Sequence, residues 1–121
     1  MASKFEAVAG KAIGYTTGGT VTQATNKGTG VTLNTESGQI TMNNAALGDG
    51  AEVTFEVTND RVAATDVVIV NHGSAGTAGA YVVQCSAVAA GSFKVTVGNV
   101  SGGSLSQAIV INFAVIKGAS S

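Results

Sequence analysis

The residues of this chain that could take part in catalysis are few and widely spaced. His72 is the single histidine, and Asp66 stands six residues before it, so a His–Asp pair is one arrangement to consider. A serine hydrolase would also need a nucleophile on a sharp turn, and the chain has no Gly-x-Ser-x-Gly motif to present one. We therefore interpret His72 as a loop residue that packs against a neighbour, and we expect no catalytic residues.

The other reactive residue types also favour structural roles. Cys85 lies on the same face of its predicted strand as Tyr81, with no cationic neighbour evident to lower the pKa of its thiol, so we expect a small buried hydrophobe. Asp49 and Glu52, with Asp60 nearby, could offer oxygen ligands to Ca²⁺, but they lack the D-x-D-x-D-G spacing of a calcium loop. We predict no metal site and no cofactor.

The composition indicates a folded chain with unusually little charge. Of the 121 residues, 45% are hydrophobic, and the mean hydropathy is +0.34, which excludes a disordered chain. Only 11% are charged, against about 25% in an average globular protein. Such a surface suits a protein that is covered by copies of itself or by a larger assembly. A neutral, threonine-rich β surface is the alternative explanation of the same composition.

Several classes of partner are disfavoured by the same sequence. The formal net charge is -1, and no Arg/Lys cluster offers a basic surface to nucleic acid. No apolar run approaches the roughly 20 residues that would span a bilayer, so we expect no membrane partner. The first residues lack the basic and apolar regions of a secretory signal, and the lone cysteine fits synthesis in a reducing cytosol.

Short runs of β-branched and aromatic residues, bounded by turn residues, predict about eight strands. They lie at 20–23, 30–34, 39–43, 52–59, 67–70, 81–88, 93–97 and 108–116. Several alternate apolar and polar residues, which is typical of strands with one wet face. The run 67–70 is apolar at every position and therefore predicts a strand covered on both sides, either inside the sandwich or beneath an interface.

The spacing of the turn signals predicts an all-β, antiparallel two-sheet sandwich that is jelly-roll-like, with an immunoglobulin-like sandwich as the near alternative. We expect one domain over 19–121, preceded by an N-terminal arm at 1–18. Segments 45–59 and 89–99 resemble each other, since each has an Ala-Ala pair, a glycine, an alternating Val/Phe strand and a closing asparagine, Asn59 or Asn99. This similarity predicts two structurally equivalent corners.

Five phrases spread along the chain are distinctive. They are GTVTQAT at 19–25, GVTLN at 30–34, GQITMN at 38–43, AATDVV at 63–68 and NFAVI at 112–116. Together they resemble a group of small proteins encoded with the virion structural genes of tailed bacteriophages, over nearly the whole chain. The resemblance implies a virion component. Within that class, small all-β proteins commonly act as capsid decoration (cement) proteins over junctions between major capsid subunits, and others form part of a head or tail fibre.

From this resemblance we expect a non-enzymatic decoration protein on the capsid surface of a virion, synthesised in the host bacterial cytoplasm. Its expected partners are the major capsid protein and copies of itself, in a dimer or trimer. The alternative is a receptor- or glycan-binding fibre module, which the absence of Trp disfavours. The candidate interface residues are Phe5, Val67, Val68, Ile69, Val70, Ile109, Ile111 and Phe113. Ordinary core is the alternative interpretation of these side chains.

Overall fold

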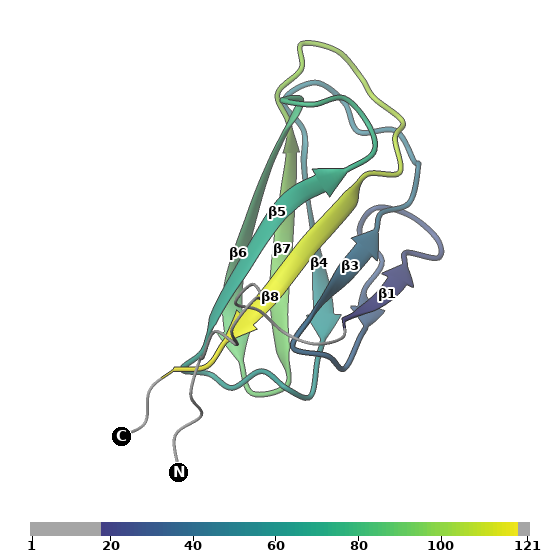
Figure 1. The fold of residues 1–121 in the computed structure, drawn as a ribbon. Helices are drawn as coiled ribbons and strands as arrows, with labels where there is room; N and C mark the ends of the chain where they lie inside the picture. Colours follow the sequence, from purple (N-terminus) through teal and green to yellow (C-terminus); the bar gives the residue numbers. More distant parts are fainter. Residues whose placement is uncertain (1–17, 119–121) are drawn as a thin grey trace, which may run out of the picture.

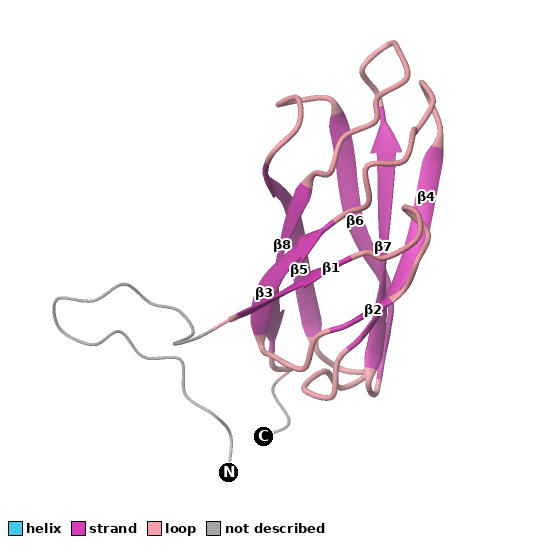
Figure 2. Ribbon diagram, turned by 90° about the vertical axis from the view of Figure 1, so that its right-hand side faces the viewer, coloured by secondary structure: helices cyan, strands magenta, loops and turns pink. Residues whose placement is uncertain are grey.

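The computed structural model describes residues 18–118, which form two four-stranded sheets packed face to face without a helix (Figures 1 and 2). Sheet A has the order β1 (Gly19–Thr22), β3 (Ser37–Thr41), β8 (Val110–Ile116) and β5 (Val67–Ser74). Sheet B has the order β2 (Val31–Thr32), β4 (Glu52–Thr58), β7 (Ser92–Asn99) and β6 (Tyr81–Ala89). The predicted all-β sandwich is confirmed, and each predicted strand is present, although β2 has only two residues.

The strand order, which the sequence left open, follows from a chain that winds around the core. Every connection crosses from one sheet to the other except the β6–β7 hairpin. At the two sides of the sandwich, β1 lies next to β2 and β5 next to β6, without pairing between the sheets. The pairings β1·β3 and β2·β4 are parallel, whereas the sequence predicted an antiparallel sandwich. In each parallel pair, the chain passes once through the other sheet and then returns beside the first strand in the same direction. The other pairings are antiparallel.

The core between the sheets is built from the inward-facing side chains of alternating strands. The side chains of Phe93 in β7 and Phe113 in β8 join the two sheets, with ring centroids 5.6 Å apart and exposed fractions of 0% and 3%. Their buried neighbours include Ile40, Phe55, Val57, Val95, Val97, Ile111 and Val115. Burial of each such side chain contributes about 1.5–3 kcal/mol, so this layer supplies most of the favourable free energy of folding.

Several candidate interface residues belong to this core. Ile109, Ile111 and Phe113 are at most 3% exposed, Val68 is buried, and Val70 packs against the core. Ile109, Ile111, Phe113 and Val68 face the opposite sheet, which favours their alternative interpretation as ordinary core. Val70 is only partly buried, and its place in an interface stays a prediction. Phe5 lies outside the described residues.

The strand at 67–70 is covered by the sandwich on one side only, so the prediction that it lies wholly inside the sandwich is wrong, and coverage beneath an interface stays a prediction. Val67 and Ile69 are 57% and 49% exposed, whereas Val68 between them is buried. The physical reason is that the described structure has two layers, so no third layer covers the outward face of sheet A. Val67 and Ile69 thus remain available as contact residues.

The two corners predicted from the internal similarity are equivalent in the structure. Asn59 directly follows β4, and Asn99 is the last residue of β7. Their exposed fractions are 0% and 1%. In each, Oδ1 accepts a hydrogen bond from the backbone N–H two residues later, and Nδ2 donates to a carbonyl of another loop. The partners are Arg61 N at 2.8 Å and Thr35 O at 2.7 Å for Asn59, and Ser101 N at 2.9 Å and Leu47 O at 2.8 Å for Asn99.

Candidate interaction surface

His72 lies near the end of β5 and packs edge-on against Tyr81, with ring centroids 5.5 Å apart. Its Nε2 is 3.1 Å from the carbonyl oxygen of Ser74 and 2.5 Å from that of Ala75. Asp66 precedes the other end of the strand, and six extended residues span about 20 Å. The packing of His72 against a neighbour is confirmed, in a strand rather than a loop, and the His–Asp pair is not formed.

Asp66 instead joins the segment before β5 to the segment after β8. Its side chain is 1% exposed, and its carboxylate accepts hydrogen bonds from Lys117 Nζ at 2.6 Å, Ala63 N at 2.8 Å and Gly118 N at 3.0 Å. Burial raises the pKa of this carboxyl, but the hydrogen bonds and the Lys117 charge outweigh burial, so the pKa lies below its ordinary value of 3.8. The carboxylate is therefore a structural charge.

The remaining reactive groups have equally local roles. Cys85 is half-buried and packs against the core, and burial raises the pKa of its thiol, which makes it a poor nucleophile. Within the described part of the chain, no three His, Cys, Asp or Glu side chains gather as a metal site would require. Asp49, from the calcium hypothesis, accepts a hydrogen bond from Gly102 N at 3.0 Å.

Lys27 is a buried cation that the sequence gave no reason to single out. It is 4% exposed, and its Nζ donates to the backbone carbonyls of Asn43 and Gln107. Burial lowers the pKa of this amine. The signal that could have found it is weak, because a lysine in the turn Asn26–Gly28 is ordinarily exposed.

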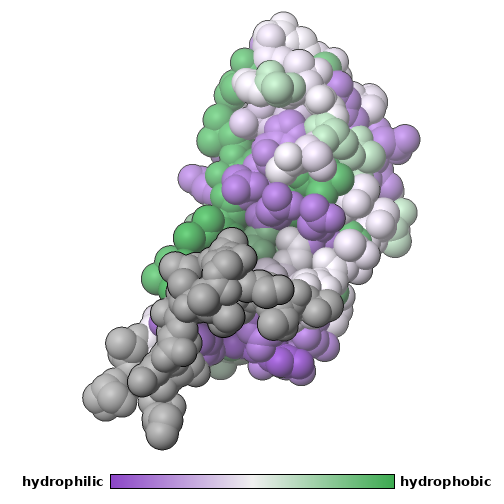
Figure 3. Space-filling model, in the orientation of Figure 1, coloured by the Kyte–Doolittle hydropathy of each residue, from purple (hydrophilic) through white to green (hydrophobic). Residues whose placement is uncertain are grey.

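The outward face of sheet A is the surface best suited to bind a partner. The four strands of this sheet contain no Asp, Glu, Lys or Arg. The β5·β8 register places exposed Val67 beside exposed Ile116, and exposed Ile69 beside half-buried Ala114. We call Val67, Ile69, Ala114 and Ile116 the apolar strip. Figure 3 shows hydrophobic surface along the β5 side of this face.

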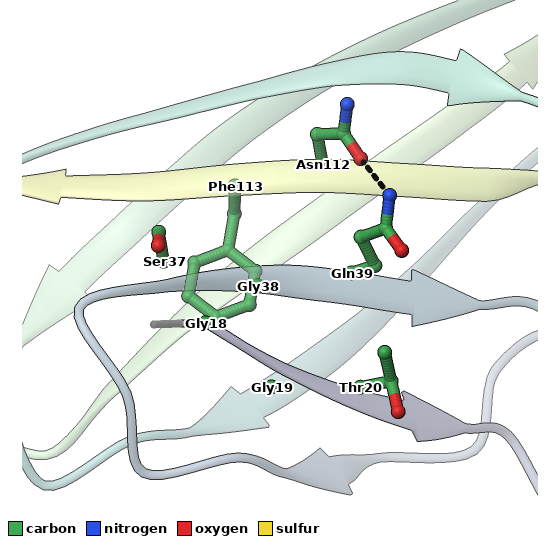
Figure 4. A pocket seen from close by; sticks show the side chains of 8 residues that line it. All are labelled: Gly18, Gly19, Thr20, Ser37, Gly38, Gln39, Asn112 and Phe113. Carbon is green, nitrogen blue, oxygen red and sulfur yellow. Dashed lines mark hydrogen bonds between the residues drawn. The ribbon is translucent and has the colours of Figure 1, made fainter. Parts of the chain in front are cut away.

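Beside the apolar strip, the same face becomes polar. A shallow depression of about 580 Å³ lies over β1, β3 and β8 (Figure 4). Its lining consists of Gly18, Gly19, Thr20, Ser37, Gly38, Gln39, Asn112 and Phe113. Gln39 Nε2 donates to Asn112 Oδ1 at 3.2 Å across the β3–β8 pair. The depression offers hydroxyl and amide groups without charge, and Phe113 is too buried to stack on a sugar ring.

Two members of the apolar strip, Ala114 and Ile116, were missed by the sequence analysis, which chose Ile109, Ile111 and Phe113 instead. The signal that could have found them is the single polar residue of β8, Asn112. An amide is costly to bury without partners, so Asn112 marks the outward face, and residues an even number of positions away share it.

Residues 18–118 include no helix of the length and apolarity that crossing a membrane requires. Comparison with known proteins supplied no family: no protein-family model, no curated protein and no solved structure matches the chain.

Proposed function

We propose that this chain is a non-enzymatic capsid decoration (cement) protein of a tailed bacteriophage. In this proposal it binds over junctions between major capsid subunits through the outward face of sheet A. The proposal is supported by the five phrases that resemble phage virion proteins. The observation that carries it is the absence of charged residues from the strands of sheet A, on the same face as the apolar strip.

The physical argument concerns the cost of removing water from this face. A charged side chain must lose its hydration when a partner covers it, and that cost is large unless a countercharge is supplied. The face of sheet A carries no such cost. Covering the exposed halves of Val67, Ile69 and Ile116 contributes roughly 1 kcal/mol each.

Polar groups adjoin the apolar strip on one side, as in the polar rim of a protein interface. Gln39 and Asn112 offer amide groups, and Thr20 offers a hydroxyl, on the adjoining part of the face. Protein interfaces combine a desolvated centre with a polar rim that satisfies hydrogen bonds. The repeated subunits of a shell would add the contributions of many copies, so that a modest contact still stabilises the head.

The test measures binding to capsids of the encoding phage that have been prepared without this protein. We expect the purified chain to bind them saturably and to raise the temperature at which they lose their contents. Ile116→Lys should weaken binding at least about tenfold, because it places a charge within the apolar strip. The matched control is Thr58→Lys, which adds the same charge at an exposed position of β4 in sheet B and should bind normally.

The fibre alternative is distinguished in the same experiment. If the chain fails to bind capsids but binds the surface polysaccharide of the host, the decoration proposal is overturned. Loss of that binding in the variant Gln39→Ala/Asn112→Ala would then assign the glycan to the depression in sheet A.

A further inference from the structure

The two sides of the sandwich end in strands of very different length. On one side the edges are β1 and β2, with four and two residues. On the other side they are β5 and β6, with eight and nine residues. A long edge strand presents a row of backbone N–H and C=O groups that another chain can pair with, whereas a short one does not. Within the described residues, the β5–β6 side is therefore the one open to strand pairing.

Neither long edge carries the residues that usually prevent such pairing. Both strands lack Asp, Glu, Lys, Arg and Pro. Each has a bulge, between His72 and Ser74 in β5 and between Ser86 and Ala89 in β6, and bulges are a protective device. Both bulges lie at one end of the strand, and they leave six regular residues in each, at 67–72 and 81–86.

We propose that a second copy of this chain pairs with this side in a twofold dimer, β5 with β5 and β6 with β6. The edges of β5 and β6 lie next to each other. A twofold axis perpendicular to the sheets can therefore pass beside both edges at once. Strands related by such an axis are antiparallel, and each four-stranded sheet would continue into its copy.

The absence of charge favours a second copy over a different partner. In a twofold interface, each residue near the axis meets itself or a close neighbour, so a charge there would face a like charge. The strands β5 and β6 have no such charge, and the nearby Asp66 is already paired with Lys117. A second copy can therefore pair with both edges without bringing like charges together.

Exposed apolar side chains lie beside the axis on both faces, next to neutral polar ones such as Asn71 and Gln84. Val67 and Ile69 flank the β5 edge on the outward face of sheet A, and Val82, 53% exposed, flanks the β6 edge on the outward face of sheet B. A perpendicular twofold keeps outward side chains outward. Registers centred on Val68, Ile69 or Val70 therefore set Ile69 opposite Val67, Ile69 or Asn71 of the second copy, respectively. The apolar cross-strand pairs among these stabilise a sheet.

The test is the oligomeric state of the full chain in the absence of capsids, by analytical ultracentrifugation over a dilution series. We expect a dimer, with hydrogen exchange of the amides at 67–72 and 81–86 slowed in the dimer and accelerated on dilution. A chain that stays monomeric at its highest soluble concentration, a trimer, or a dimer with unprotected amides in these segments would overturn the proposal. Because capsids are absent, each of these results leaves the proposed function untouched.

Charge substitutions at the two edges provide the matched variants. Asn71→Lys with Gln84→Lys places lysines at exposed positions of β5 and β6, and should raise the dimer dissociation constant at least about tenfold. Thr22→Lys with Thr32→Lys adds the same charge on the short-edge side and should leave the dimer intact. Equal weakening by both pairs would contradict the assignment. If the first pair fails to fold, the exchange pattern of the unsubstituted chain still decides.

Discussion

The outward faces of the two sheets share one architecture and differ in chemistry. The face of sheet B places Glu56 directly opposite Lys94, and it joins Thr54 to Thr96 through hydroxyl oxygens 2.8 Å apart. The face of sheet A has no charge and carries the apolar strip. The low charge of the whole chain is therefore unevenly distributed. One face is suited to water, and the other can be covered by a partner at little cost in desolvation.

At the end of sheet A where β3 and β5 begin and β8 ends, the flanking segments carry charges that are paired. Arg61 lies 3.0 Å from Glu36, which precedes β3, and Lys117, which follows β8, lies 2.6 Å from Asp66, which precedes β5. Opposite charges in contact expose less of their field to a binding partner. The neutrality of the face thus extends to its lower border.

The inward faces of the two sheets, unlike the outward ones, should be equally well packed. The largest expected effect tests this. Phe93→Ala in sheet B and Phe113→Ala in sheet A should each lower the free energy of unfolding by about 3–5 kcal/mol, because both rings are fully packed. Urea unfolding measures this loss. The double variant should lose less than the sum, since the two rings touch. A loss below about 1 kcal/mol for one of them would show that its sheet is loosely packed.

The next effect concerns the ion pair at the border of sheet A. Asp66→Asn should lower the free energy of unfolding by about 1–3 kcal/mol at neutral pH, since it removes a buried charge that accepts three hydrogen bonds. The folded-state pKa of Asp66 lies below 3.8. The stabilisation is therefore complete above about pH 4 and is lost as the pH falls through the folded pKa.

Thermal or urea unfolding of the two proteins at several pH values measures this dependence. The difference in stability between the unsubstituted chain and Asp66→Asn should shrink as the solution is acidified. A difference that stays constant from neutral pH to about pH 3 would contradict the assignment of Asp66 as a stabilising carboxylate.

The smallest effect sharpens the contrast between the faces. Lys94→Glu sets two carboxylates opposite each other on sheet B and should cost at most about 1 kcal/mol, with the cost reduced by added salt. Gln39→Ala on sheet A removes an exposed neutral hydrogen bond and should cost a similar amount or less, independently of salt. Urea unfolding at low and high salt separates the two. If the loss of unfolding free energy in Gln39→Ala depended on salt, a charge would act on the face of sheet A, and the description of that face as neutral would be wrong.

The sequence predicted the strands correctly, but it distinguished outward from inward residues in some strands and not in others. In β4, polar residues alternate with Val53, Phe55 and Val57, so the inward face was evident. In β5 and β8, residues of both parities are apolar, and the alternation that distinguishes the faces is almost absent. The interface prediction therefore mixed core residues such as Ile111 with exposed ones such as Ile69.

What the sequence alone determined about this protein is local: eight strands, their turns, and the two equivalent corners at Asn59 and Asn99. These depend on a side-chain period of two and on hydrogen bonds between residues two apart, which neighbouring residues dictate. Only the tertiary structure decided that the strands without charge belong to one sheet and that both long edges share one side. Those facts depend on which distant strands pair, and pairing is selected by the burial of the whole chain rather than by any one segment.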